Sequence, residues 1–134
     1  MKPKVLIVDD NSILRETARS ILESKFPALR VIEAGDGKET FIQIHDHWPD
    51  LILMDIRLPG QNGFKLTRKI KNLFPEIVII IFTNHDLPEY RKAAYENGAD
   101  FFVSKSSPNR KKLSTLVGSI LAEAGLDPYS NESR

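Results

Sequence analysis

Five polar residues that could together transfer a phosphoryl group each stand at the end of a short apolar run. Asp9 and Asp10 follow the first run, Asp55 another, and Thr83 and Lys105 end two later ones. Carboxylates supply the oxygen ligands that Mg²⁺ prefers, and an aspartate can itself be the nucleophile. A lysine ammonium attracts phosphate as a mobile point charge. These groups therefore predict metal-assisted transfer of a phosphoryl group to an aspartate.

That chemistry requires the five side chains to meet in the folded protein. The apolar runs alternate with helical patterns, which is typical of an α/β fold with a parallel sheet and crossover helices. In such a sheet the carboxyl ends of the strands lie along one edge, where ligands bind. We therefore expect five βα units with these side chains at one edge of the sheet. The expected strands cover residues 5–8, 29–34, 51–54, 77–82 and 101–104.

Caps and breakers predict where the helices begin and end. Asn11 can cap the first helix, and residues 59–63 indicate a long turn. The strongly β-branched run 77–82 is expected at the centre of the sheet. Ser107 and Pro108 place a cap and a first-turn proline before the last helix. Residues 1–124 are expected to form the domain, and the polar residues 125–134 are interpreted as a frayed tail.

Composition limits the other classes of function. The 134 residues include 19 basic and 18 acidic ones, so bulk charge favours neither nucleic acid nor a membrane surface as a partner. The absence of cysteine excludes disulfides, thiolate metal sites and thiol catalysis. The apolar stretch near the N-terminus is too short for a signal peptide or a membrane span. A cytoplasmic protein is the expectation.

The chain resembles the receiver domain of two-component response regulators over about residues 4–124. Any one of its motifs is weak evidence, but their order and their positions at strand ends make the resemblance specific. The matching segments are Val8-Asp9-Asp10-Asn11, Leu53-Met54-Asp55-Ile56 with Leu58-Pro59-Gly60 and Gly63, Phe82-Thr83, and Gly98-Ala99-Asp100 with Lys105. The resemblance implies a flavodoxin-like, doubly wound parallel sheet with strand order 2-1-3-4-5.

The resemblance also implies roles for individual residues. Asp55 would be the phosphoacceptor, Lys105 would pair with Asp55 and then with the phosphoryl group, and Thr83 would close onto that group. Asp10 would bind Mg²⁺ (or Mn²⁺) directly and Asp9 mostly through water. The remaining metal ligands would be Asp55 and the backbone carbonyl of Arg57. Lys105 and Thr83 are expected at exposed strand ends.

Several positions set this chain apart within that family. Ser106 follows Lys105 where proline is usual, which favours a trans bond because a cis bond before a non-proline residue costs about 2.5–4 kcal/mol. Phe102 occupies the position of the switch aromatic and has no hydroxyl. Arg57 and His85 stand two residues past Asp55 and Thr83, at positions that in receiver domains flank the path of the water that hydrolyses the aspartyl phosphate. Both side chains are large, so a long-lived phosphate is expected.

The implied partners are a sensor histidine kinase or phosphotransfer protein upstream and an effector or fused output domain downstream. The face made by the fourth helix, fifth strand and fifth helix would switch, and a phosphorylation-dependent homodimer is one form it could take. The protein would assist its own phosphorylation without being an ordinary enzyme.

The same residues allow other interpretations. A degenerate receiver that binds partners without phosphorylation is the alternative. A phosphohydrolase needs a second acid where Arg57 stands. His45 and His47 lack a third metal ligand nearby, and the basic run 110–112 is expected to be a solvated face.

Overall fold

A parallel sheet of five strands forms the centre of the molecule in the computed structural model, which describes residues 2–106 and 110–130. The strand order is β2-β1-β3-β6-β7, and every neighbouring pair is parallel. This order confirms the expected α/β doubly wound topology. The strands are β1 (Lys4–Val8), β2 (Arg30–Ala34), β3 (Leu51–Met54), β6 (Val78–Thr83) and β7 (Phe101–Ser104).

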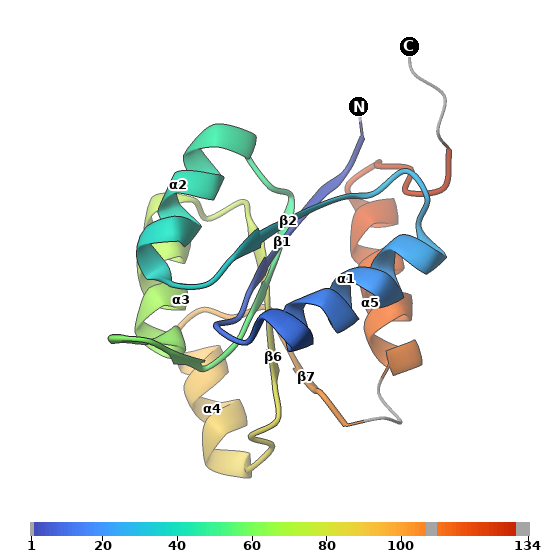
Figure 1. Ribbon diagram of the computed structural model, residues 1–134. Helices are drawn as coiled ribbons and strands as arrows, with labels where there is room; N and C mark the ends of the chain where they lie inside the picture. The colour runs from blue at the N-terminus through green and yellow to red at the C-terminus, as the bar shows by residue number, and fades with distance from the viewer. Residues whose placement is uncertain (1, 107–109, 131–134) are drawn as a thin grey trace.

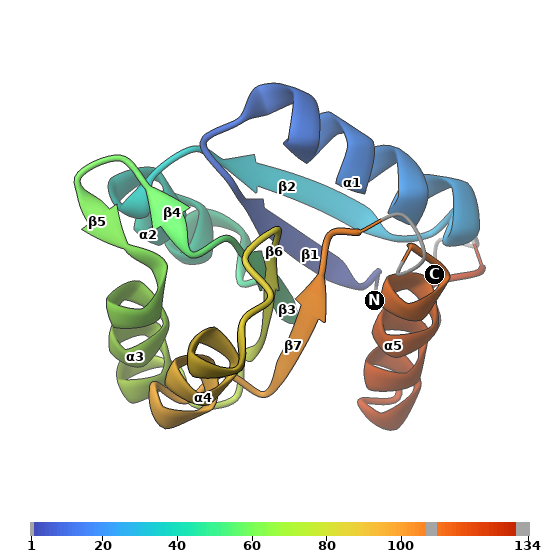
Figure 2. The ribbon, with the colours of Figure 1, turned by 90° about the horizontal axis from the view of Figure 1, so that it is seen from below.

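The helices cover both faces of this sheet, as Figures 1 and 2 show. Helices α1 and α5 lie on one side, and α2, α3 and α4 lie on the other. Each connection therefore crosses over to the next strand, as parallel strands require. The helices are α1 (Ser12–Lys25), α2 (Gly37–His47), α3 (Gly63–Leu73), α4 (Pro88–Glu96) and α5 (Arg110–Glu123).

Two apolar clusters, one on each face, hold the helices to the sheet. Leu22 and Val117 belong to the cluster under α1 and α5. Leu66 and Ile70 belong to the cluster under α2, α3 and α4. The strand β3 is buried along its whole length because it faces helices on both sides. The strand ends are thus fixed by a packed core on either face.

Two local expectations differ from the structure, and a third lies outside the described residues. Residues 59–63 were expected as one long turn, but only Pro59 and Gly60 form the turn, which joins β4 (Arg57–Leu58) and β5 (Gln61–Asn62) in a small antiparallel hairpin, and Gly63 begins α3. The β-branched run was expected at the centre of the sheet, but β6 lies between β3 and β7, and β3 is central. The predicted cap and proline at Ser107 and Pro108 lie outside the described residues.

The interpretation of the C-terminal segment as frayed is wrong for residues 125–130. Pro128 is buried, and its carbonyl accepts a hydrogen bond of 2.9 Å from the Ala28 amide, between α1 and β2. The Tyr129 ring meets Phe26 edge-on with 5.5 Å between the ring centres. The hydrogen bond and the ring contact together hold Pro128 and Tyr129 against the connection between α1 and β2. No helix among the described residues is long and apolar enough to cross a membrane.

The start of α3 packs against the backbone next to Asp55, at Gly63. The Gly63 amide donates a 2.7 Å hydrogen bond to the Ile56 carbonyl. A Cβ atom at Gly63 would lie 2.2 Å from the Asp55 carbonyl oxygen and 2.8 Å from the Ile56 Cα. Backbone atoms cannot yield as the end of a flexible side chain can, so only glycine fits here.

Replacing Gly63 with alanine should therefore lower the free energy of unfolding by about 2 kcal/mol, as overpacking does. Gly35→Ala is the matched control, since a Cβ there meets only ordinary contacts at 3.5 and 3.9 Å. That variant should stay within about 0.5 kcal/mol of the parent. Urea denaturation measures both, and equal stability of the two variants would contradict the steric argument.

Candidate functional site

The parallel register brings the five polar residues to one edge of the sheet. Val8 pairs with Met54, so Asp9 and Asp55, which follow them, are neighbours. Thr83 pairs with Ser104, the residue before Lys105. The Asp55 amide donates to the Val8 carbonyl at 3.0 Å. The Lys105 amide donates to the Thr83 carbonyl at 2.8 Å. Their convergence could be predicted from the sequence, because each of these residues ends a strand or follows one.

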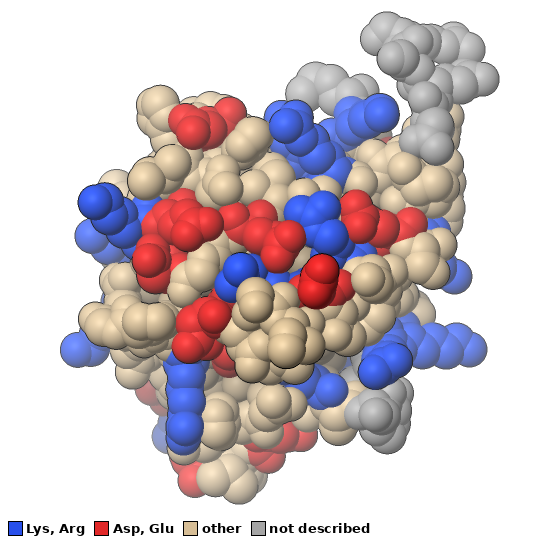
Figure 3. All heavy atoms as spheres, in the orientation of Figure 1, with Lys and Arg blue, Asp and Glu red and all other residues tan. Residues whose placement is uncertain are grey.

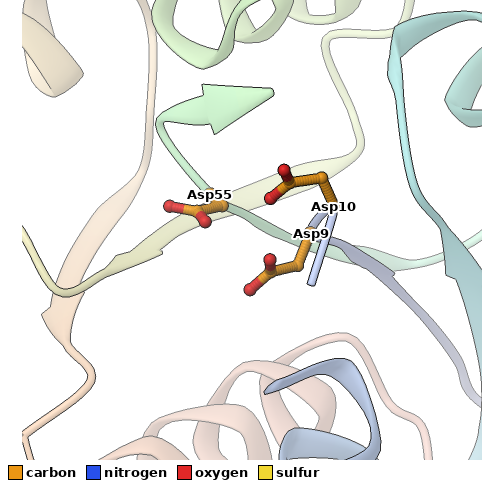
Figure 4. Close-up of side chains that lie close together, drawn as sticks. All are labelled: Asp9, Asp10 and Asp55. Carbon is orange, nitrogen blue, oxygen red and sulfur yellow. The ribbon is translucent and has the colours of Figure 1, made fainter. Parts of the chain in front are cut away.

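The three carboxylates lie within reach of one ion. Asp9, Asp10 and Asp55 each offer an oxygen, and these oxygens lie within 4.8 Å of one another. Figure 4 shows Asp9 and Asp10 coming from the end of β1 and Asp55 from the end of β3. Asp9 is buried, Asp55 is half-buried and Asp10 is exposed. The site therefore opens to solvent on the Asp10 side.

Lys105 provides the positive charge between two of these carboxylates. Its ammonium pairs with the Asp9 carboxylate and lies 3.5 Å from Oδ2 of Asp55. Its side chain is only 9% exposed, with the ammonium 5.6 Å from the centre of the Phe82 ring. Screening by water is weak at such a position, so the attraction is stronger than at the surface.

The carboxyl group of Asp55 is poised between opposing influences. Burial raises its pKa above the ordinary value of 3.8, Lys105 opposes the rise, and the nearby Asp9 charge adds to it. The Ile56 amide, 2.8 Å from Oδ1, and the Thr83 hydroxyl also lower the pKa. The net direction is upward, so the site holds an anion that is short of compensating charge.

Thr83 lies deeper than the sequence indicated. It was expected at an exposed strand end, but it is fully buried, and Lys105 is largely buried as well. The Thr83 hydroxyl accepts a hydrogen bond of 3.2 Å from the His85 amide. His85 is half-buried against Tyr90, with 5.9 Å between the rings, and Arg57 is exposed. Arg57 lies two residues after Asp55 and His85 two after Thr83, and their proximity to a phosphoryl group stays a prediction.

Phe102 is buried, with 3% of its surface exposed. The guanidinium of Arg91 lies 4.7 Å from the centre of its ring, and Arg91 also pairs with Asp86 at 2.9 Å. These contacts give Phe102 a packing role, and switching by Phe102 stays a prediction.

Sequence reasoning missed Arg15 and Glu33. Arg15 of α1 donates to the backbone carbonyl of Asp9, and its Nε lies 3.0 Å from the Glu33 carboxylate on β2. Arg19, one turn further, binds the same carboxylate at 2.8 Å. The four-residue spacing of the two arginines places them on one helix face, which was the available signal. They hold the backbone that carries the acidic pair.

Two further expectations concern residues outside the carboxylate cluster. The bond between Lys105 and Ser106 is trans, as are the other peptide bonds of the described residues. His45 is exposed and its ring pairs with the neighbouring Asp46 at 3.1 Å. No metal-binding cluster among the described residues includes a histidine.

The donor set fits a hard divalent cation. It consists of oxygen atoms only, and one of the three carboxylates is open to water, which suits an ion that keeps part of its hydration shell. A bound cation would supply positive charge that makes three adjacent carboxylates tolerable. The same edge offers a nucleophilic carboxylate, a lysine and a hydroxyl for a phosphoryl group.

Because Asp55 is desolvated near other anions, Asp55→Asn should unfold with a free energy higher by on the order of 1 kcal/mol at pH 7 without metal. Asp46→Asn on the exposed end of α2 is the matched control and should change stability by less than about 0.5 kcal/mol. Thermal or urea denaturation in chelator measures both.

The pH dependence of this gap follows from the raised pKa. A carboxyl whose pKa rises on folding is most favourable to the folded state below its ordinary pKa, and that benefit is lost as pH rises through the folded pKa. The gap between Asp55→Asn and the parent should therefore close as pH falls towards about 4. A gap that widens on acidification would contradict this electrostatic account.

Comparisons with known proteins agree on one family. The model of the response regulator receiver domain matches residues 5–117. The oxygen regulatory protein NreC of Staphylococcus carnosus (strain TM300) is 31% identical over 131 residues, covering 97% of this chain and 60% of the relative. NreC of Staphylococcus haemolyticus (strain JCSC1435) is 34% identical over 111 residues, covering 82% and 51%. The chain thus spans between half and about three fifths of these relatives.

Solved structures give the same answer. A two-component response regulator of the LuxR family from Aurantimonas sp. SI85-9A1 superimposes with a TM-score of 0.82 at 33% identity, covering 98% of this chain and 91% of that one. The chemotaxis response regulator CheY4 of Vibrio cholerae, at 24% identity and a TM-score of 0.78, shares the fold over 90% of this chain and 100% of its own. The chain therefore belongs to the response regulator receiver domain family of two-component systems, whose members are phosphoacceptors rather than enzymes in the ordinary sense.

Proposed function

We propose that Asp55 accepts a phosphoryl group from a histidine kinase or a phosphotransfer protein in a reaction that requires Mg²⁺. The observation that carries this proposal is the meeting of three carboxylates within 4.8 Å beside a largely buried lysine. Three adjacent carboxylates repel one another, and Lys105 supplies only one positive charge against them. A divalent cation would offset this repulsion, and Lys105 would contact the transferred phosphoryl group.

In the proposed step an oxygen of Asp55 attacks the phosphorus atom and forms a new P–O bond. The bond between phosphorus and the donor's histidine nitrogen breaks, and the nitrogen keeps the electron pair. Oδ1 of Asp55 accepts a hydrogen bond from the Ile56 amide, whereas Oδ2 lies 3.5 Å from the Lys105 ammonium. Lys105 would follow the charge from the carboxylate onto the phosphoryl oxygens, and the Thr83 hydroxyl would donate to one of them.

The residues that would hold Mg²⁺ (or Mn²⁺) are Asp10 and Asp55 directly and Asp9 mostly through water. The backbone carbonyl of Arg57 is a further candidate ligand, since Arg57 begins β4 two residues after Asp55. When bound, the cation supplies positive charge that offsets the carboxylates and the transferred group. The residues of this chain position the nucleophile and the lysine around it.

Phosphorylation would be read out on the face formed by α4, β7 and α5. Thr83 connects the site to this face, because the Thr83 hydroxyl holds the His85 amide in the β6–α4 connection. Movement there would reach Arg91 and Phe102. The proposed reader is a downstream effector, a fused output domain or a second copy in a phosphorylation-dependent dimer. A cytoplasmic location belongs to the same proposal.

A degenerate receiver that binds partners without phosphorylation is the second candidate. It is favoured only by Phe102, which is already buried and lacks a hydroxyl that could register a switch. The acidic and lysine positions are all retained, so the phosphoacceptor remains the better-supported function.

Acetyl phosphate with Mg²⁺ should add one phosphoryl group to the parent, at Asp55, as measured by intact mass spectrometry. Removal of Mg²⁺ with a chelator or Asp55→Asn should abolish the gain, and Asp46→Asn should leave it unchanged. A parent that never gains mass, or an Asp55→Asn protein that gains it at the parent's rate, would contradict the proposal.

The lifetime of the aspartyl phosphate should be set by Arg57 and His85. Hydrolysis needs a water in line with phosphorus, and neither side chain is a carboxylate or amide able to orient it. The double variant Arg57→Asn, His85→Glu should lose phosphate faster than the parent, by about tenfold or more.

The matched control is Arg30→Asn, His45→Glu, which makes the same changes at exposed positions away from the site. It should keep the parent's rate. Equal rates for the parent and the Arg57→Asn, His85→Glu variant would show that these two side chains do not limit hydrolysis.

A further inference from the structure

A groove lies at the opposite edge of the sheet, where the strands begin. It has a volume of about 660 Å³ and runs between the residues after α2, the residues before β6, the start of β7 and the last turn of α5. In Figure 1 this edge is at the top, where β1 starts and α5 ends. Ile77, Phe101 and Ile120 line it with apolar surface, and Trp48 stands at its rim.

Helices α2 to α5 all end at this edge. At three of these ends a basic side chain of the protein binds backbone carbonyl oxygens at or just after the end of the helix. The C-terminal end of a helix carries partial negative charge that attracts cations. Lys4 binds the end of α2, Lys71 binds the turn after α3, and Arg68 binds the end of α4. The accepting carbonyls are those of His47 at 2.9 Å, Pro75 and Ile77 at 3.0 and 2.8 Å, and Glu96 at 3.1 Å.

The end of α5 differs from the other three. Its last turn has no basic residue and carries Glu123 instead, which is unfavourable beside the negative helix end. Glu123 and Glu76 both line the groove, and neither side chain has a hydrogen bond or ion pair with another described residue. The groove's other acidic residues, Asp50 and Asp100, each accept a 2.9 Å hydrogen bond from a backbone amide, and Asp100 also pairs with Lys71. Within residues 2–106 and 110–130, the negative charges of Glu76 and Glu123 therefore have no paired cation.

Trp48 adds an independent sign of binding. Its backbone lies in the left-handed region, at a φ of 49°, where a bulky residue costs about 1–2 kcal/mol. The indole contacts Phe74 edge-on at 5.8 Å, yet 60% of the residue stays exposed. An exposed aromatic beside carboxylates is suited to a cationic side chain. The left-handed conformation itself ends α2, with the Trp48 amide donating to the Ile44 carbonyl, so the exposed ring is the feature that favours binding.

We propose that this groove binds a basic, partly apolar segment of a partner protein. An arginine or lysine would sit between Glu76 and Glu123 at the end of α5, next to the Trp48 ring. An apolar neighbour would pack on Phe101 and Ile120, which are half-buried. The negative charge selects against nucleic acids and acidic peptides. Basic and acidic side chains both occur on the face in Figure 3, and the net charge of the chain is +1, so the excess of acid at the groove is a local feature. The proposal does not depend on phosphorylation of Asp55.

Trp48 is the only tryptophan of the chain, so its fluorescence reports on this groove alone. The probe is a synthetic peptide of alternating arginine and leucine, and the comparison peptide has glutamate in place of arginine. Mg²⁺ is present throughout to occupy the carboxylates at the other edge. The test variant is Glu76→Gln, Glu123→Gln. Its control, Glu16→Gln, Glu89→Gln, removes the same charge at exposed positions elsewhere.

The basic peptide should change the Trp48 emission saturably, and calorimetry should give the same affinity. The groove variant should bind it at least about tenfold more weakly, whereas the control should match the parent, with both variants folded by circular dichroism. Equal weakening in both variants, equal binding of the acidic peptide, or no binding to the parent would overturn the proposal. So would self-association of the chain through Trp48 without peptide, since a second copy would then be the occupant.

Discussion

The contact on which this site depends is that of the Lys105 ammonium with the carboxylates of Asp9 and Asp55. It joins the ends of β7, β1 and β3 across the sheet, with β6 and its Thr83 between. Without that positive charge, two desolvated anions would face each other at close range, which costs free energy in a poorly screened setting. The lysine offsets part of the repulsion, but burial and the Asp9 charge still leave the pKa of Asp55 raised. The proposed metal cation would offset the remaining negative charge, and Lys105 would be free to contact the proposed phosphoryl group.

The remainder of the fold fixes the geometry of this contact. Apolar clusters on both faces hold the strands in register, so the residue after each strand has a defined neighbour. Arg15 and Glu33 brace the backbone at Asp9, and Gly63 lets α3 start directly against the backbone of Asp55. The two edges of the sheet differ in chemistry. One gathers carboxylates around a lysine, and the other gathers helix ends, of which that of α5 has no cation among the described residues.

Much of this could be predicted because strand-end residues in a parallel sheet must meet along one edge. Asp9, Asp10, Asp55, Thr83 and Lys105 converge for that reason alone, and the strand order follows the resemblance. What could not be predicted depends on contacts between distant side chains. The burial of Thr83 and Lys105, and the guanidinium of Arg91 on Phe102, have no local pattern in the sequence. The docking of Tyr129 on Phe26 was missed because a polar segment gave no hint of its apolar partner.

The most direct test of the central claim is a crystal structure of the protein with Mn²⁺ and beryllium fluoride, in which anomalous scattering locates the metal. The account predicts manganese bound by the carboxylates of Asp10 and Asp55 and by the Arg57 carbonyl. It also predicts beryllium fluoride on Asp55 with the Lys105 ammonium in contact with it. Manganese bound elsewhere, beryllium fluoride on another residue, or a Lys105 that stays on Asp9 and ignores the fluoride would contradict the account.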